Sequence, residues 1–95
     1  MKTSADAPAR WCAYNYSLIF EDKLGSRVTV IGEALADPDP MVRQRALDWC
    51  WQNTRQHTDL KGPLRPLLDR AAQQDSNPMN QAYAKEILRG WGATD

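Results

Sequence analysis

Residues that usually carry catalysis or bind metals are scarce in this chain of 95 residues. It has a single histidine, His57, and two cysteines, Cys12 and Cys50, too few for a disulfide framework or a Cys/His zinc site. A Cys50–His57 nucleophile pair is disfavoured because about two helical turns separate the residues. The sequence also lacks a Gly-rich phosphate loop and a serine nucleophile elbow. We therefore expect no catalytic residue, cofactor or metal, and two reduced, buried thiols.

Net charge and long apolar runs are also missing. Twelve basic and twelve acidic residues cancel, which argues against a nucleic-acid-binding protein, since such proteins usually carry a basic excess. A local patch of arginines stays open as an alternative, and its members would be Arg10, Arg27, Arg43 and Arg45. No run approaches the roughly 18 apolar residues of a membrane span, and the N-terminus lacks the apolar core of a secretory signal. These absences predict a cytoplasmic protein without membrane contact.

Three proline-containing breaks divide the rest of the chain. In Asp37-Pro38-Asp39-Pro40 the prolines end one helix, while Asp39 can cap the next and Pro40 suits its first position. Asn77-Pro78 repeats this pattern, and Gly62-Pro63 predicts a further break. Apolar residues recur every three to four positions between the breaks, which predicts helices. The expected helices cover residues 26–36, 40–56, 64–74 and 78–91.

The segment 9–24 has two interpretations. Trp11, Tyr14 and Leu18 fit one face of a helix, whereas Tyr14, Tyr16, Leu18 and Phe20 alternate with more polar residues as in a strand. A hairpin with the stretch 28–30 is the strand alternative. We favour a helix, because Pro8 suits a helix start and the other segments are helical. Residues 1–8 are expected to form a flexible lead-in.

An internal repeat relates two of the breaks. Shifting the sequence by 38 positions (37 to 75) places Asp37 on Asp75 and Pro40 on Pro78. The same shift superposes three further pairs: Ala34 on Ala72, Met41 on Met79, and Ala46 on Ala84. Each copy is therefore a helix, an Asp-x-x-Pro break and a second helix.

The first copy resembles a HEAT repeat. Asp37-Pro38-Asp39-Pro40-Met41-Val42-Arg43-Gln44-Arg45-Ala46 is similar to the turn and second-helix start of that family, while Asn80 and Gln81 depart from it in the second copy. The chain length and the helical periodicity predict an all-α fold in a single domain over 9–95. The resemblance covers roughly residues 27–90 and implies that the repeats, at about 26–57 and 60–91, stack with the N-terminal segment as a short α-solenoid of about five helices. It also implies a structural ladder of Asp37, Pro40, Arg43, Asp75 and Pro78.

Aromatic residues supply the candidates for binding. Trp49 lies on the predicted inward face, whereas Trp51 lies about 160° away on a helix. The predicted partner-binding residues around it share a polar face, and they are Gln44, Asp48, Trp51 and Arg55. Trp51 either forms a binding hot spot there or packs against a neighbouring helix.

Tyr16 and Phe20 extend the apolar surface of the first segment beyond one face, so this helix would be covered on two sides. We therefore expect a small protein–protein interaction module that is not an enzyme, with a protein or a second copy of itself as partner. Its size suggests an adaptor, inhibitor or immunity-type protein of bacterial or phage origin. The alternatives are a nucleic-acid-binding helical module and a small enzyme or ligand-binding protein.

Overall fold

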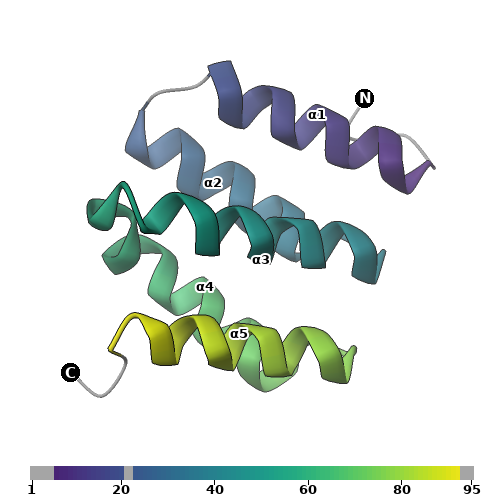
Figure 1. The fold of residues 1–95 in the computed structure, drawn as a ribbon. Helices are drawn as coiled ribbons and strands as arrows, with labels where there is room; N and C mark the ends of the chain where they lie inside the picture. Colours follow the sequence, from purple (N-terminus) through teal and green to yellow (C-terminus); the bar gives the residue numbers. More distant parts are fainter. Residues whose placement is uncertain (1–5, 21–22, 93–95) are drawn as a thin grey trace. The chain divides into compact units, whose positions relative to one another are not determined.

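The computed structural model describes residues 6–20 and 23–92, which form five α-helices, one short 3-10 helix and no strand. The helices are α1 (Ala7–Phe20), α2 (Leu24–Leu35), α3 (Pro40–Thr54), η1 (Thr58–Leu60), α4 (Lys61–Gln74) and α5 (Pro78–Gly90) (Figure 1). The predicted all-α class is confirmed, and the described part of segment 9–24 is helical rather than a strand. Residues 1–5 of the predicted lead-in and residues 21–22 lie outside the described residues. The helix α1 begins inside the remainder of that lead-in.

The first break is held by two side-chain bonds to the backbone. The Asp37 carboxylate accepts a hydrogen bond from the Asp39 N–H at 2.9 Å, and the Asp39 carboxylate accepts one from the Met41 N–H at 2.8 Å. Pro40 is the first residue of α3, a position where its missing N–H costs nothing. The turn thus satisfies backbone groups that α3 itself leaves unpaired.

The second break has the same bonding. The Asp75 carboxylate accepts from the Asn77 N–H at 2.8 Å, and the Asn77 side chain accepts from the N–H groups of Met79 and Asn80. Pro78 is the first residue of α5. The repeat found in the sequence is therefore also a repeat of local structure, with equivalent residues in equivalent bonds.

The predicted break at Gly62-Pro63 is wrong. The helix α4 begins at Lys61, so Gly62 and Pro63 occupy its first turn. Backbone N–H groups of the first turn have no partner within the helix, which is why a proline is tolerated there.

Two compact units make up the chain, 1–46 and 47–95, with the boundary inside α3. In the first unit, α1 packs against α2. Its core consists of apolar residues from α1, α2 and the start of α3, namely Ala13, Tyr14, Leu18, Val30, Ile31, Ala34, Val42 and Ala46. The predicted boundary between the repeats, near 57–60, does not coincide with the boundary between the two units.

The second unit is built on the close packing of α4 against α5, with η1 beside α4. Its fully buried large side chains are mostly leucines, together with one isoleucine, one cysteine and one threonine: Leu47, Cys50, Thr54, Leu60, Leu64, Leu68 and Ile87. Trp49, which we expected in the core, is only half-buried. At the end of the unit, Gly92 adopts a φ of 75°, a conformation that favours glycine, just after α5 ends.

Candidate protein interaction surface

An apolar stripe runs along the solvent-facing side of α1. It consists of Pro8, Cys12, Tyr16, Ile19 and Phe20, which we call the outer face of α1; all five are exposed. The last three are 64%, 64% and 70% exposed, unusually high values for large apolar side chains. Positions 8, 12, 16 and 20 are four residues apart and therefore share one side of the helix. Because the buried residues of α1 lie on another side, this helix is apolar on two sides.

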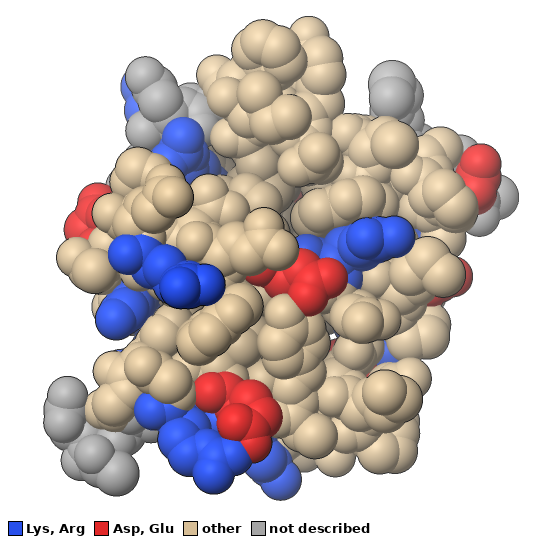
Figure 2. Space-filling model, in the orientation of Figure 1, with Lys and Arg blue, Asp and Glu red and all other residues tan. Residues whose placement is uncertain are grey.

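The outer face carries no charge. Arg10 is the one charged residue of α1, and its side chain is only 12% exposed. Its guanidinium donates two hydrogen bonds to the Asp37 carboxylate, from Nε at 2.8 Å and from Nη2 at 2.9 Å. Figure 2 has the orientation of Figure 1, and its surface is mainly uncharged at the place where Figure 1 shows the middle of α1. The charge of α1 is thus used inside the unit rather than on the surface.

Asp37 is the centre of the network that orients α1. Besides Arg10, the Tyr14 hydroxyl donates to its carboxylate at 3.3 Å, and the side chain of Asp37 is fully buried. The bond from Arg10 holds the pKa of Asp37 below its ordinary value. Burial and the same carboxylate raise the pKa of Tyr14. Since Arg10 and Tyr14 both face the turn before α3, the opposite side of α1 faces solvent.

Arg43 stabilises the same turn from α3. Its Nη1 donates to the carbonyl oxygens of Asp37 at 2.8 Å and Pro38 at 3.1 Å. The HEAT resemblance implied a structural role for this arginine, and both of these acceptors belong to the turn that precedes its own helix.

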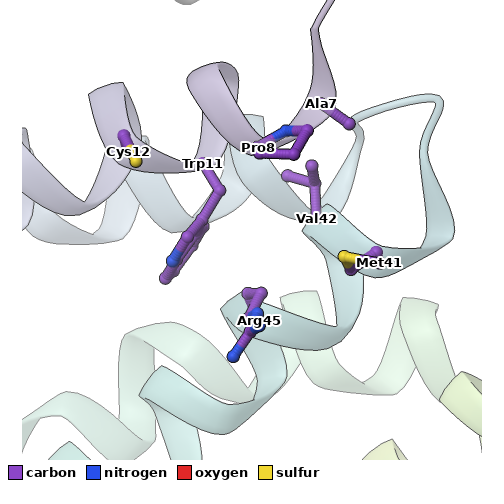
Figure 3. Close-up of a pocket in the computed structure, with 7 residues that line it drawn as sticks. All are labelled: Ala7, Pro8, Trp11, Cys12, Met41, Val42 and Arg45. Atoms are coloured by element: carbon purple, nitrogen blue, oxygen red, sulfur yellow. The ribbon is translucent and has the colours of Figure 1, made fainter.

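A groove with a volume of about 270 Å³ lies beside the outer face, between the first turns of α1 and of α3. The lining residues are mostly apolar, and they are Ala7, Pro8, Trp11, Cys12, Met41, Val42 and Arg45 (Figure 3). Among the lining residues that the structure describes, Arg45 is the one cation. Pro8 and Cys12 belong to both the groove and the outer face, so the two form one continuous surface.

The two rings at the aromatic end of the outer face pack against each other. The rings of Tyr16 and Phe20 have their centroids 4.5 Å apart with an interplanar angle of 41°. Such a pair is held by mutual packing before any partner binds. Binding through these rings therefore loses less side-chain freedom than binding through isolated side chains.

The four residues predicted as a binding surface on α3 have different surroundings. Gln44 is exposed and belongs to the first unit, whereas the other three belong to the second. Asp48 accepts a hydrogen bond from the Tyr83 hydroxyl; burial and this bond raise the pKa of Tyr83. Trp51 is half-buried against Gly90, and the Arg55 guanidinium lies 5.8 Å from the Trp51 ring centroid. Asp48 and Trp51 thus have packing roles within their unit, and partner binding through them stays a prediction.

Sequence reasoning identified Tyr16 and Phe20 but missed Cys12, Ile19 and the groove. The expectation that both cysteines are buried is wrong for Cys12, which is exposed, and right for Cys50, whose burial raises the pKa of its thiol to about 12. The sequence did carry a signal for this face, because no residue from Trp11 to Phe20 is charged. The buried side of the helix uses only some of these residues, so others must form an uncharged exposed side.

Other kinds of site have little support. Within residues 6–20 and 23–92, no cluster of three His, Cys, Asp or Glu side chains could hold a metal ion. None of the helices described is long and apolar enough to cross a membrane.

Comparison with protein-family models, curated proteins and solved structures gives no match for this chain.

Proposed function

We propose that this chain is a small, non-enzymatic protein–protein interaction module that binds its partner through the outer face of α1. The observation that carries the proposal is an exposed helix face with three large apolar side chains and no charge. Apolar patches of several hundred Å² on a small soluble domain usually mark interaction sites. The groove lined by Trp11 and Met41 extends this patch and offers a pocket for one side chain of the partner.

We further propose that the module is built from HEAT-like repeats stacked as a short solenoid. The support is the pair of equivalent breaks, in which Asp37 and Asp75 bond to the backbone two residues on and Pro40 and Pro78 begin the following helices. Repeats of this kind bury their apolar sides by stacking on neighbours, so a terminal element with an unusually apolar outer side is a natural docking surface.

Two other functions fit the residues less well. For nucleic acid, Arg10 is bound to Asp37 and Arg43 donates to backbone carbonyls, so both already have partners within the first unit. For catalysis, the strongest shifts in pKa belong to Cys50 and Tyr83, and burial is the main cause of both. Buried groups held in their neutral form suit packing better than reaction.

The test is site-specific photo-crosslinking in the cells that make the protein. A photoreactive phenylalanine analogue replaces Tyr16, and a matched variant carries it at Met79, a large apolar residue that is 78% exposed in the second unit. We expect a discrete crosslinked protein product from position 16 and none from position 79. Equal products at both positions, or none from position 16, would contradict the proposal.

A further inference from the structure

We propose, building on the interaction function above, that the partner of the outer face is a second copy of this chain, docked antiparallel so that Phe20 of each copy enters the groove of the other. A symmetric dimer requires a patch that is complementary to itself. The outer face meets this requirement in size, in charge and in shape.

Residue sizes along the outer face are graded. The N-terminal half carries the small residues Pro8 and Cys12, and the C-terminal half carries the aromatic residues Tyr16 and Phe20. If two copies of α1 lie antiparallel about a centre near position 14, Cys12 faces Tyr16 of the other copy and Pro8 faces Phe20. Each aromatic ring then lies over a small residue. A parallel pair would instead set ring against ring and leave space between the small residues.

Helix geometry permits this arrangement. Residues four apart form a ridge, and such ridges on two helices align when the helices cross at roughly 50°. The ridge 8–12–16–20 extends over almost the whole of α1. Two copies can therefore pack these ridges together around the centre of the outer face.

The groove fits the proposed occupant. Its volume of about 270 Å³ exceeds the roughly 150 Å³ of a cavity that holds benzene, so a phenylalanine ring can enter. Pro8 forms part of the groove wall and is the residue that faces Phe20 of the second copy. Arg45 at the groove supplies a cation that can lie over the entering ring.

Charge and area agree with self-association. A two-fold contact brings two copies of the same patch together, so a patch with charges of one sign repels itself, whereas the outer face of α1 has no charge. Tyr16, Ile19 and Phe20 together expose on the order of 400 Å², because a whole aromatic side chain buries about 150–250 Å². Doubled for two copies and extended by the groove walls, this area approaches the ~1,200 Å² at which stable interfaces begin.

The first experiment measures the solution mass of the full chain by light scattering over a concentration series. We expect a dimer, and we expect Phe20→Asp to weaken association by about thirtyfold or more, as for a hot-spot residue. Met79→Asp, an exposed apolar residue outside the face, is the matched control and should leave the dimer unchanged. Circular dichroism confirms that each variant is folded. A monomeric wild-type chain at all concentrations overturns the proposal, as does a Phe20→Asp dimer of unchanged affinity.

The second experiment tests the antiparallel register by oxidation with diamide. The Tyr16→Cys variant should form a disulfide-linked dimer, because the new thiol faces the native Cys12 of the other copy. The Cys12→Ser/Tyr16→Cys double variant should not, and neither should the wild type, whose two Cys12 residues would lie beyond the roughly 7 Å limit between Cα atoms. Efficient crosslinking of the double variant would contradict the antiparallel arrangement. Cys50 is fully buried and does not interfere.

The crosslinked product from position 16 in cells separates this inference from the function on which it rests. A product of twice the chain mass supports the second copy as partner. A product with a different protein, together with a monomeric purified chain, overturns the dimer and leaves the interaction function standing.

Discussion

The indole ring of Trp51 lies directly against the backbone of Gly90. A methyl group at Gly90 would come within 2.7 Å of Cζ3 and 3.0 Å of Cη2 of that ring. Glycine here provides the space that lets a half-buried tryptophan of α3 pack on the last residue of α5. Of the two roles that the sequence left open for Trp51, this contact supports packing within the second unit.

We expect Gly90→Ala to lower the free energy of unfolding by about 1–2 kcal/mol, because displacement of the ring outweighs the better helix propensity of alanine. In a Trp51→Ala background the same change should be neutral or stabilising, since the ring is gone. Urea unfolding of the four proteins gives the coupling energy. A stabilising effect of Gly90→Ala in the wild-type background would show that the contact is loose.

Thr54→Val should destabilise the second unit by about 1–3 kcal/mol, because the buried indole N–H of Trp91 donates to the Thr54 hydroxyl at 2.9 Å and would lose its acceptor. Thr29→Val is the control: the hydroxyls of Thr29 and Thr54 each donate to the carbonyl oxygen four residues earlier in their helix, but Thr29 is exposed. Thermal unfolding of the two variants makes the comparison. Equal losses would mean that the bond to Trp91 contributes nothing.

The two helix caps should contribute similar amounts to the free energy of unfolding. Asp39→Ala and Asn77→Ala each remove the acceptor of the N–H two residues on, and each should cost about 1 kcal/mol. Asp69→Ala, an exposed residue in the middle of α4, should change stability by less than about 0.5 kcal/mol. A loss at only one cap, measured by urea unfolding, would show that the two turns differ in energy despite their equivalent bonds.

Alkaline stability should depend on Cys50. Burial raises the pKa of its thiol to about 12 in the folded chain, whereas an unfolded cysteine ionises near 8.5. The unfolded state therefore loses the proton first, and the free energy of unfolding falls as pH rises above about 8.5, by up to about 1.4 kcal/mol per pH unit. Urea unfolding between pH 8 and pH 10 should show a shallower fall of the free energy of unfolding for Cys50→Ala than for the wild type, and an equal fall in the two proteins would contradict this prediction.

Acid stability should depend on Asp37. Its pKa is lowered in the folded chain, mainly by the bond from Arg10, so its contribution is complete above the unfolded value near 3.9 and is lost as pH falls through the folded value. We expect Asp37→Asn to be less stable than the wild type at neutral pH, with a smaller further loss in acid. Unfolding curves measured between neutral pH and pH 2 that stay parallel would show that the pair with Arg10 does not control acid unfolding.

Local signals in the sequence predicted the breaks well. Pro40 and Pro78 begin α3 and α5 because proline fixes its own backbone and lacks an N–H, constraints that act regardless of the rest of the fold. Ala46 and Ala84, which the internal repeat superposes, are both fully buried. The prediction of a helix break at Gly62-Pro63 was wrong because glycine and proline are also tolerated in the first turn of a helix.

Contacts between distant residues could not be predicted. Nothing near Arg10 indicates that it pairs with a carboxylate 27 residues away, so the sequence did not show that the one charge of α1 is directed away from the outer face. Helical periodicity set Trp51 on a polar face of α3, but the side of a helix that is covered depends on its neighbours. Here the neighbour is Gly90, whose small size matters only once α5 lies beside it.

The internal use of Arg10 has a thermodynamic consequence for whatever binds α1. With the single charge of α1 bonded to Asp37, the outer face attracts a partner mainly by removing apolar surface from water. Binding there should be nearly insensitive to ionic strength, should show a negative heat-capacity change, and should weaken on cooling.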